Sequence, residues 1–393
     1  MPRGPLHAPI AHLDSGYRIG VRIAQVAPRG EQPWSGVLTV IVHLSAALAR
    51  RGHEVEVWRW SDWPPDRYAV QRRVLETGGV VEVPVPASWI PGRAAGALAE
   101  IRAVDVIHLH GAFNPSNTAM ARSLRRPYAC SPHSGYDPVS LRRSRWAKLA
   151  YRAVFERRML ERAAVLVALT DAELHDLRRF GATAPAEVIP NGVEPPPDDL
   201  DADGFRRELA LPGDAILAVF VGRLDVHRKG LDVLVRGIAD APDWHLALVG
   251  PPFRDVELLE RIVGERSLGD RVHFVGERHG RHLQQTFYGA DVFALTSRWE
   301  GMPMALLEAL ALGRPAVVSP AVERTIGVGD AGAGWVVSER DVGPVLRDIR
   351  RDELSERGRA ALQLSKRYNW DRVAERYEAA YERARGSRQR VSP

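Results

Sequence analysis

Short apolar runs rich in β-branched residues alternate with amphipathic helical segments along almost the whole chain. In the first half, the predicted strands are 21–26, 55–58, 104–109, 128–131, 165–169 and 187–189. In the second half, they are 216–221, 245–249, 272–275, 292–295, 316–319 and 335–337. Nearly continuous apolar runs of this length are typical of strands buried on both faces of a parallel sheet. The alternation therefore predicts a doubly wound α/β fold.

The strand–helix pattern restarts once, after a segment with the composition of a linker. Residues 189–203 contain four prolines followed by clustered aspartates, and such residues interrupt regular structure. A chain of 393 residues also exceeds one ordinary core. We expect two Rossmann-like domains facing a cleft, with a flexible lead-in at 1–18. The N-terminal domain would span 19–194, the C-terminal domain 195–366, and a last helix with a tail 367–393.

Composition supports a globular protein, because 45% of the residues are hydrophobic and 26% are charged. No apolar run approaches the roughly 20 residues that a membrane-spanning helix needs. The first residues lack the apolar stretch of a signal peptide. Cys130 is the single cysteine, which excludes an internal disulfide and a cysteine-based zinc site. A cytoplasmic location is expected.

The net charge of +5 is unevenly distributed. Residues 1–195 hold 25 Lys/Arg and 18 Asp/Glu, a surplus of 7, and the remainder holds 29 and 31, a deficit of 2. No helix-turn-helix, RNP-like or zinc pattern accompanies the basic half, so nucleic-acid binding is not indicated. Lysine occurs only at 148, 229 and 366, so each lysine departs from the chain's preference for arginine.

A cationic loop follows the predicted strand 216–221, at the edge of the sheet where α/β proteins bind ligands. Gly222 permits a tight turn and close backbone approach. Arg223 offers a bidentate fork to phosphate oxygens, and Lys229 adds a point charge before a helix predicted from about residue 231. The alternative is a surface loop with ordinary charges. We interpret Gly222, Arg223 and Lys229 as a phosphate site.

Two carboxylates, Glu300 and Glu308, flank the start of a second predicted helix. Pro303 suits the first helical position, so the helix should run over about 303–312. Glu300 would then lie in the preceding loop, where the first helical amides favour an anion. Glu308 interrupts an otherwise apolar segment, and a carboxylate there needs a partner. Capping by Glu300 and a solvated Glu308 are the structural alternative.

These residues form a motif that resembles a known enzyme family. Gly-Arg-Leu at 222–224 with Lys229-Gly230, and Ser-x-x-Glu-Gly-x-Pro-x-x-x-Leu-Glu-Ala-x-Ala-x-Gly-x-Pro at 297–315, resemble the retaining glycosyltransferases of family 4. The resemblance extends over segments 48–55, 106–110, 189–193 and 368–370. It implies the GT-B fold, with a C-terminal helix that crosses back onto the first domain.

The resemblance also implies a role for each motif residue. Arg223 and Lys229 would hold the diphosphate of a UDP- or GDP-linked sugar, Glu308 the ribose and Glu300 the transferred sugar. The donor-binding set would be completed by Gly36, Gly222, Val275, Glu277, Gly301, Met302, Pro303 and Met304. Many family members have two adjacent glycines where this chain has Ser35-Gly36, and Gly36 alone still allows close approach of the backbone to a phosphate. Arg223, Lys229, Glu300 and His133 would be the catalytic residues.

The acceptor side would use histidines of the first domain. His133 follows a predicted strand and matches the family's active-site histidine, which contacts the sugar near the reaction centre. His108 and His110 share one face of a strand end, and His110 lies closer to the cleft. A structural role is the alternative for each histidine. Asp201-Ala202-Asp203 has the metal signature of another transferase class, but it lies in the linker, so no metal and no cofactor are expected.

Residues 141–162 predict one basic amphipathic helix with Trp146, Leu149, Ala150, Ala153, Val154 and Leu160 on its apolar face. The helix suits peripheral docking on an anionic membrane or binding of an acceptor phosphate, and equally a packed helix with a solvated basic face.

The sequence thus predicts a metal-independent retaining glycosyltransferase that acts on an acceptor hydroxyl. The acceptor would be a lipid-linked saccharide for a surface polysaccharide, or a small metabolite. A nucleotide-sugar epimerase, a phosphorylase of the same fold and a two-lobed sugar-binding module remain alternatives.

Overall fold

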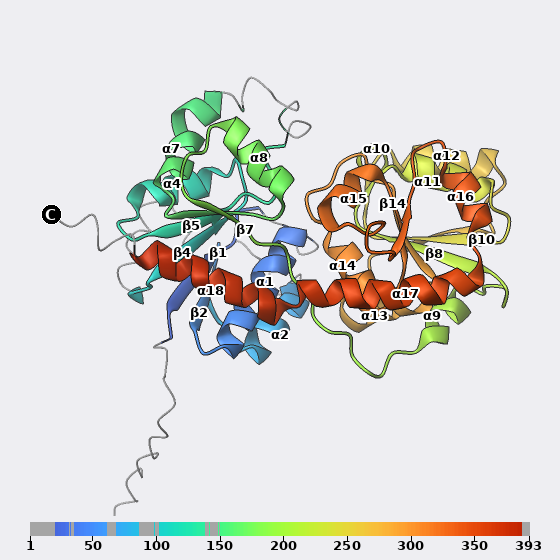
Figure 1. Ribbon diagram of the computed structural model, residues 1–393, viewed down its shortest axis with the longest axis horizontal. Helices are drawn as coiled ribbons and strands as arrows, with labels where there is room; N and C mark the ends of the chain where they lie inside the picture. Colours follow the sequence, from blue (N-terminus) through green and yellow to red (C-terminus); the bar gives the residue numbers. More distant parts are fainter. Residues whose placement is uncertain are drawn as a thin grey trace, which may run out of the picture.

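The computed structural model describes residues 20–30, 32, 35–60, 68–85, 98, 102–137, 141, 148 and 150–386. It has two lobes, each built on a parallel sheet, and a long C-terminal helical segment that runs along both (Figure 1). The predicted lead-in 1–18 lies outside the described residues. None of the described helices is both long and apolar enough to cross a membrane.

The first lobe contains a parallel sheet with the strand order β3-β2-β1-β4-β5-β6-β7 among the described residues. The strands are β1 (Arg22–Val26), β2 (Glu54–Trp60), β3 (Val81–Val85), β4 (Val106–His110), β5 (Tyr128–Ser131), β6 (Val165–Ala168) and β7 (Ala186–Val188). Successive residues alternate between two apolar layers: Val165 and Val167 join the layer under the last helix, and Leu166 and Ala168 join the opposite one. This period of two is the reason for the continuous apolar pattern.

Helices cover both faces of this sheet. They are α1 (Gly36–Arg50), α2 (Ala69–Thr77), α4 (Pro115–Ser123), α7 (Arg157–Arg162) and α8 (Asp171–Phe180). Ser35 caps α1, since its side chain accepts a hydrogen bond from the amide of Val37. Gly181 ends α8 in the left-handed conformation, with φ 97°.

The second lobe repeats the arrangement with the order β12-β10-β8-β13-β14-β15. Its strands are β8 (Ile216–Val221), β10 (Trp244–Val249), β12 (Val272–Gly276), β13 (Val292–Leu295), β14 (Ala316–Val318) and β15 (Gly334–Val336), with a small pair β9 (Leu224–Asp225) and β11 (Pro252–Arg254). Its helices are α9 (Ala202–Glu208), α10 (Val226–Lys229), α11 (Leu231–Ala239), α12 (Val256–Glu265), α13 (Gly280–Gly289), α14 (Met304–Ala311), α15 (Pro320–Ile326) and α16 (Val342–Asp348). The predicted doubly wound α/β architecture with two parallel sheets is confirmed.

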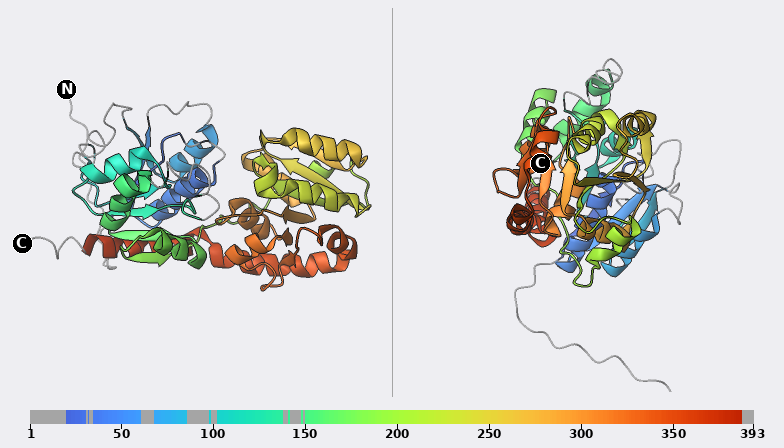
Figure 2. Two further views of the ribbon diagram at one scale, coloured as in Figure 1. Left: turned by 90° about the horizontal axis from the view of Figure 1, so that it is seen from above. Right: turned by 90° about the vertical axis from the view of Figure 1, so that its right-hand side faces the viewer.

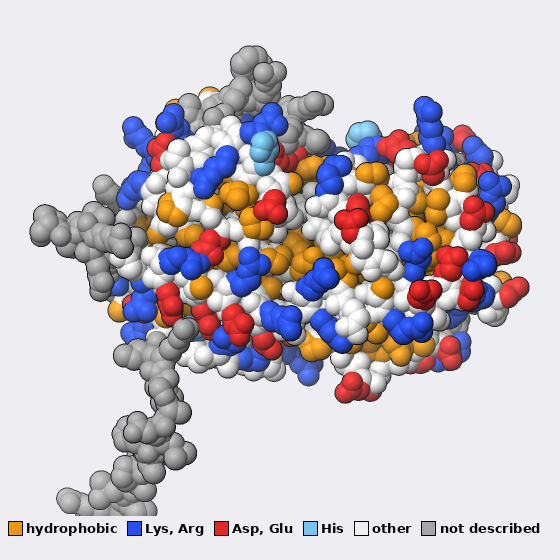
Figure 3. All heavy atoms as spheres, viewed as in Figure 1, with side chains coloured by type: hydrophobic (Ala, Val, Ile, Leu, Met, Phe, Trp, Pro, Cys, Tyr) orange, Lys and Arg blue, Asp and Glu red, His pale blue; other side chains and the backbone are white. Residues whose placement is uncertain are grey.

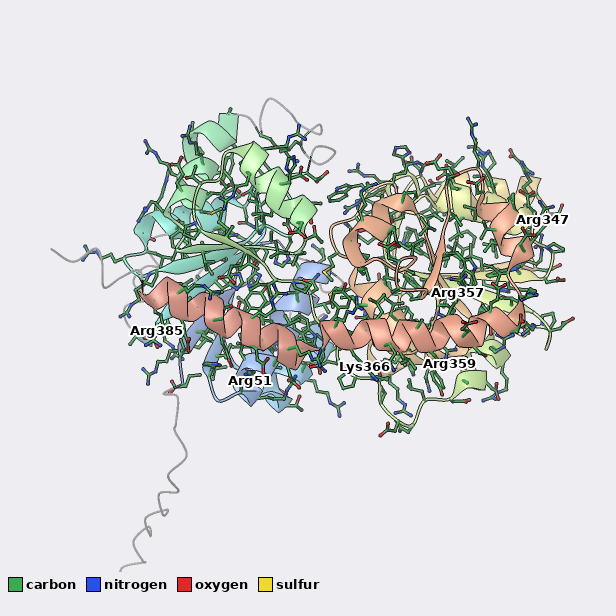
Figure 4. The ribbon with its side chains drawn as sticks, in the orientation of Figure 1. Arg51, Arg347, Arg357, Arg359, Lys366 and Arg385 are labelled. Atoms are coloured by element: carbon green, nitrogen blue, oxygen red, sulfur yellow. The ribbon has the colours of Figure 1, made fainter. Side chains whose placement is uncertain are left out.

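The C-terminal segment joins the lobes a second time. Helix α17 (Arg351–Ser365) packs on the second lobe, a 3₁₀ turn η3 (Lys366–Tyr368) follows, and α18 (Trp370–Gly386) returns to the first (Figures 1 and 2). Figure 4 traces this path through its labelled side chains, from Arg357 and Arg359 on the second lobe through Lys366 to Arg385. The predicted crossover helix is confirmed, because Trp370, Tyr377 and Tyr381 are buried in the core of the first lobe.

The two connections touch where they pass each other. The amide of Val193 donates to the carbonyl of Tyr368 at 2.6 Å, and Val193 forms a parallel bridge with Asn369. Gly192 lies against the ring of Trp370, where a Cβ would come within 2.3 Å of the ring. Arg51 and His53 both bind Glu378 of α18, at 2.6 and 2.9 Å, on the side shown in Figure 4. These contacts fix the start of α18 to the linker and its middle to the residues that follow α1.

Two expectations need correction. The strand β3 was not predicted, because its short sequence contains Pro84 at the edge of the sheet. The predicted continuous helix 141–162 is interrupted, since Arg152–Glu156 form a π-helix before α7 begins. A π-turn shifts the phase of the helix, and Val154, assigned to the apolar face, is 52% exposed. Trp146, Arg142, Arg143 and Arg145 lie outside the described residues.

The face seen in Figure 3 carries basic and acidic side chains interspersed along the C-terminal helices. The basic surplus of the first half therefore does not produce a field of one sign on this face. Nothing here resembles the continuous basic stripe of a nucleic-acid-binding surface.

Candidate functional site

A cavity of about 740 Å³ lies between the two lobes, with walls from both. It collects residues that the sequence places far apart, at the carboxyl ends of strands and at helix starts. The sequence-predicted residues that line it are Gly36, His133, Gly222, Arg223, Lys229, Glu277, Glu300, Gly301, Met302, Pro303, Met304 and Glu308. A cavity of this size accommodates an elongated ligand of nucleotide-sugar dimensions.

The cationic loop follows β8. Gly222 has φ 148°, which a side chain would disfavour. Arg223 is exposed, and its guanidinium lies over the ring of Phe253 at 4.8 Å. Arg223 forms no ion pair with any residue that the structure describes. Its five donors are therefore available to an anion in the cavity.

Lys229 ends the short helix α10, which Gly230 stops with φ 63°. A Cβ on Gly230 would lie 2.2 Å from the carbonyl oxygen of Thr296, so only glycine lets the two loops approach. This approach places Nζ of Lys229 2.5 Å from Oε1 of Glu300. One ion pair therefore links the predicted phosphate site to the predicted sugar site.

Glu300 is a buried carboxylate held in its charged form. Burial alone would raise its pKa, but the charges of Lys229 and Arg228 and the hydrogen bonds from Lys229 and Ser297 outweigh burial and lower the pKa. Oγ of Ser297 donates to Glu300 Oε1 at 2.7 Å. An ionised carboxylate is an acceptor only, which suits hydroxyl groups of a sugar.

Arg298 connects the loop that carries Glu300 to the segment that carries Lys229. Its guanidinium forms two hydrogen bonds with Asp232, at 2.9 and 3.1 Å, and a third with the carbonyl of His227 at 2.7 Å. Its amide donates to the carbonyl of Arg228 at 2.9 Å. The sequence identified Arg298 only as part of the motif, because Asp232 lies 66 positions away. Arg298 stabilises the relative position of Lys229 and Glu300.

Helix α14 begins at Met304, with Pro303 as the capping residue and not as the first helical residue. The predicted helix start was therefore one residue early, because the fixed φ of proline also suits the capping position, and here Pro303 has extended backbone (φ −73°, ψ 116°). The first amides of α14 have no partner within the helix, and Met304 and Ala305, where the helix begins, line the cavity. The side chain of Asn191 donates to the carbonyl of Met302 at 3.2 Å and so ties this loop to the linker.

Glu308 lies one turn inside α14, and its carboxylate accepts no hydrogen bond from any described residue. Burial raises its pKa to about 7, and a positive charge on His43 would oppose that shift. Because Glu308 lines the cavity, a hydroxyl-bearing ligand would supply the missing partners. Glu308 is the residue for which the family resemblance predicts ribose binding, and this role stays a prediction.

The first lobe contributes the loop after β5. His133 and Ser134 both adopt positive φ, at 52° and 59°, which is uncommon for residues with side chains. Glu173 stabilises this loop, since one of its oxygens accepts from the amide of Ser134 and the other from Leu169, the latter at 2.7 Å. Burial raises the pKa of Glu173 to about 7, although both amide hydrogen bonds oppose the shift.

Two predicted residues lie outside the cavity wall. His110 is fully buried and reaches the site only through a hydrogen bond between its Nδ1 and Nε2 of His133, at 2.9 Å. Val275 packs against the core of the second lobe, whereas Glu277, two residues further on, lines the cavity. Strand β12 ends at Gly276, so the chain turns toward the cavity only after Val275.

Sequence reasoning missed Arg228 and Trp299. The guanidinium of Arg228 lies 4.1 Å from the centroid of the Trp299 ring, and both residues line the cavity. Burial lowers the pKa of Arg228, opposed by the charge of Glu300. The adjacency of Arg228 to Lys229 was the one available signal. Asp201, by contrast, caps α9 and pairs with Arg207 at 2.6 Å, an ordinary structural role.

Comparisons with known proteins place the chain in a family. Residues 34–195 match the family described as Glycosyltransferase Family 4, and residues 215–351 match Glycosyl transferases group 1. A D-inositol 3-phosphate glycosyltransferase of Actinosynnema mirum is 29% identical over 94% of this chain and 97% of its own. Another, from Mycolicibacterium smegmatis, is 25% identical over 93% and 90%.

Solved structures show the same fold. HepE of Anabaena in complex with UDP and glucose superposes with a TM-score of 0.74 at 18% identity, covering 92% of this chain and 99% of that one. Sucrose-phosphate synthase of Thermosynechococcus elongatus gives 0.73 at 23% identity, covering 93% and 100%. The family matches span both lobes and include every motif residue of the cavity. The chain belongs to the retaining glycosyltransferases of family 4 and has the GT-B fold.

Proposed function

We propose that this enzyme transfers a sugar from a UDP-linked donor to a hydroxyl group of a small polyhydroxylated acceptor, without a metal ion. The observation that carries the proposal is the pairing of Lys229 with Glu300 in the same cavity as the unpartnered Glu308. These groups provide, in order, a cation for phosphate, an acceptor for sugar hydroxyls and an acceptor for ribose hydroxyls.

The donor would lie along the second lobe. Arg223 and Lys229 bind the diphosphate, and the first amides of α14 add donors at a helix N-terminus. Glu308 accepts the ribose hydroxyls, and Glu300 accepts those of the transferred sugar. HepE, which shares the fold, has been solved in complexes with UDP and with UDP-glucose, which favours UDP over GDP as the nucleotide.

The reaction would proceed by departure of the diphosphate and attack on the same face. The bond from the anomeric carbon to the diphosphate oxygen breaks, and a bond to the acceptor oxygen forms on the side the diphosphate leaves. The acceptor proton passes to a phosphate oxygen of the departing group. Arg223 and Lys229 stabilise the negative charge that develops there, which is the main catalytic contribution. Closure of the cavity excludes water.

The acceptor is proposed from the relatives. Several proteins that match almost the whole chain are named D-inositol 3-phosphate glycosyltransferases. A cyclitol phosphate or a related polyol is therefore the first acceptor class to test. A lipid-linked saccharide is the second, since the segment 141–162 is basic.

The experiment is a matrix of donors and acceptors. UDP-glucose, UDP-N-acetylglucosamine and GDP-mannose are each incubated with inositol 3-phosphate, inositol or a lipid-linked saccharide, with and without a chelator. We expect transfer from a UDP-sugar that is unaffected by the chelator and retains the anomeric configuration. Donor turnover without any acceptor product would indicate an epimerase. Complete loss with chelator, restored by manganese, would overturn metal independence.

A further inference from the structure

A continuous chain of buried hydrogen bonds connects the last helix of the protein to His133 in the cavity. Tyr381 of α18 contacts Gln25 of β1 at 2.9 Å, and Gln25 contacts Nε2 of His110 at 2.7 Å. Nδ1 of His110 then contacts Nε2 of His133 at 2.9 Å. Tyr381 and Gln25 are 356 positions apart in sequence. Gln25, His110 and Tyr381 are buried almost completely.

The same hydroxyl extends the chain in the other direction. Tyr381 contacts Nδ1 of His108 at 2.8 Å, and Nε2 of His108 contacts Oγ of Ser131 at 2.8 Å. The whole network thus runs from Ser131 through two strands and the crossover helix to His133. Each contact needs one donor and one acceptor, because two facing donors or two facing lone pairs in a dry interior cost free energy.

The rings in this network are neutral. Burial lowers the pKa of His108 and of His110 well below its ordinary value and lowers that of His133 to about 4. Each ring therefore carries a single N–H at neutral pH, on one nitrogen or the other. The position of that proton follows from the neighbours of each ring.

Gln25 sets the direction. Its amide oxygen faces Nε2 of His110, so that nitrogen carries the proton and donates. Nδ1 of His110 must then accept, and Nε2 of His133 donates to it. On the other side the amide nitrogen of Gln25 donates to Tyr381, whose hydroxyl donates to Nδ1 of His108. Nε2 of His108 then donates to Ser131. All contacts are satisfied in one direction.

We propose that Tyr381 and Gln25, acting through His110, are positioning residues that keep the proton of His133 on Nε2 and leave its Nδ1 lone pair for a substrate hydroxyl. The proposal rests on the proposed function, because it needs a hydroxyl-bearing substrate beside His133, which lines the cavity. Tyr381 holds the amide of Gln25 in the orientation that the relay requires. The C-terminal helix thereby determines which atom of an active-site side chain can accept a hydrogen bond.

The first test measures protons directly. Ring-¹⁵N histidine spectra of the full-length protein distinguish protonated from unprotonated ring nitrogens, and His110→Gln and His133→Gln variants assign the signals. We expect His108, His110 and His133 all to carry the proton on Nε2. The reversed pattern, with protons on Nδ1 in all three rings, would overturn the proposal.

The second test removes one hydroxyl. Tyr381→Phe keeps the ring in the core but frees the amide of Gln25 to rotate, so His133 should populate both proton positions. Tyr128→Phe is the matched control, because its hydroxyl is also buried in the first lobe and donates to the carbonyl of Met159 at 2.6 Å, outside the network. Both variants lose one buried hydrogen bond, but only Tyr381→Phe should change the His133 spectrum.

Kinetics provide the functional readout. The assay uses UDP-glucose or whichever donor the wild-type enzyme is found to use. Tyr381→Phe should lower kcat by about fivefold, the rate ratio that corresponds to the net free energy of one hydrogen bond. The KM for the donor and the affinity for UDP should stay unchanged. Gln25→Met should behave in the same way, and Tyr128→Phe should retain kcat. Equal loss in Tyr381→Phe and Tyr128→Phe would show a merely structural role.

The spectra keep this inference separate from the proposed function. If no donor is turned over by the wild-type protein, the proposed function fails, but the proton positions are still measured. If the wild-type enzyme is active and Tyr381→Phe changes neither the His133 spectrum nor kcat, the relay is wrong while the function stands.

Discussion

Nζ of Lys229 lies 2.5 Å from Oε1 of Glu300, and this contact joins two loops that are 71 positions apart in sequence. The pair lies where the diphosphate and the sugar of a donor would meet. With a donor bound as proposed, this single ammonium group would have two partners, one supplied by the protein and one by the donor. Its charge lowers the pKa of the buried Glu300 carboxylate and, in the proposed function, would also stabilise the leaving group.

Lys229→Ala should remove a charge-assisted hydrogen bond to phosphate. Such bonds contribute about 1.5–3 kcal/mol, which predicts a loss of about 10- to 150-fold in kcat/KM for the donor. Lys366→Ala is the control, since Lys366 is an exposed lysine on η3. Steady-state kinetics of the two variants check the prediction. Full activity in Lys229→Ala would show that the diphosphate lies elsewhere.

Glu300→Gln should separate turnover from nucleotide binding. The change removes the charge that accepts sugar hydroxyls, so kcat should fall by at least about tenfold. It also releases Lys229 from its protein partner, so the affinity for UDP should be unchanged or slightly higher. Calorimetry with UDP measures this affinity. A UDP affinity reduced as much as kcat would contradict the assignment of Glu300 to the sugar.

Glu308 predicts a pH dependence of donor binding. Its raised pKa of about 7 means that the carboxyl is mostly protonated at pH 6 and mostly ionised at pH 8. The ionised form accepts ribose hydroxyls, so the affinity for UDP-glucose should rise by about tenfold between these values. UDP-glucose is the suitable ligand, because its diphosphate has no proton to lose in this range. Titrations at several pH values measure the effect.

Glu308→Gln is the control for that pH dependence. It should bind UDP-glucose more weakly than the wild type at pH 8, with an affinity nearly independent of pH. The effect of pH on the free energy of unfolding has the opposite sign. Because the pKa of Glu308 is raised in the folded state, the protonated carboxyl favours the folded protein, and this stabilisation is lost as pH rises through 7. In thermal denaturation without donor, the melting temperature of Glu308→Gln relative to that of the wild type should therefore be higher at pH 8 than at pH 6.

Gly301 and Ser134 predict a steric test of cavity closure. A Cβ at Gly301 would lie 2.3 Å from Oγ of Ser134, so Gly301→Ala should push the lobes apart and lower kcat/KM by about 10- to 100-fold. Adding Ser134→Gly removes the obstructing side chain at a position whose φ of 59° suits glycine. The double variant should recover most of the activity. No recovery would mean that Gly301 acts through its backbone alone.

The sequence predicted those features that depend on a local pattern of residues. Strands 128–131, 216–221 and 292–295 have the predicted bounds, because continuous apolar runs between polar turns have few other structures available. Lys229, Glu300 and Glu308 were identified because each departs from its surroundings: a rare lysine, a carboxylate before a helix, and a carboxylate in an apolar segment. The structure places all three on one cavity.

Long-range contacts could not be predicted in this way. The cation–π contact of Arg228 with Trp299 depends on how two loops approach, and no periodicity reports that. The same holds for the tie between Arg298 and Asp232 and for the role of Gln25, a polar residue in an apolar strand. His110 was expected to line the cavity. The alternation of residues along its strand could not show that the ring of His133 lies between His110 and the cavity.

The return of α18 to the first lobe has a consequence for how the protein is made. Residues of α18, among them Trp370, Tyr377, Tyr381 and Ala384, complete a core whose other buried residues come from the first half of the chain. On the ribosome, the first lobe therefore emerges early but remains incomplete until α18 has been synthesised. The second lobe, whose strands and covering helices lie between Ala202 and Ser365, is available as a whole before that point. Synthesis begins with the N-terminal lobe, yet the C-terminal lobe is the first that can finish folding.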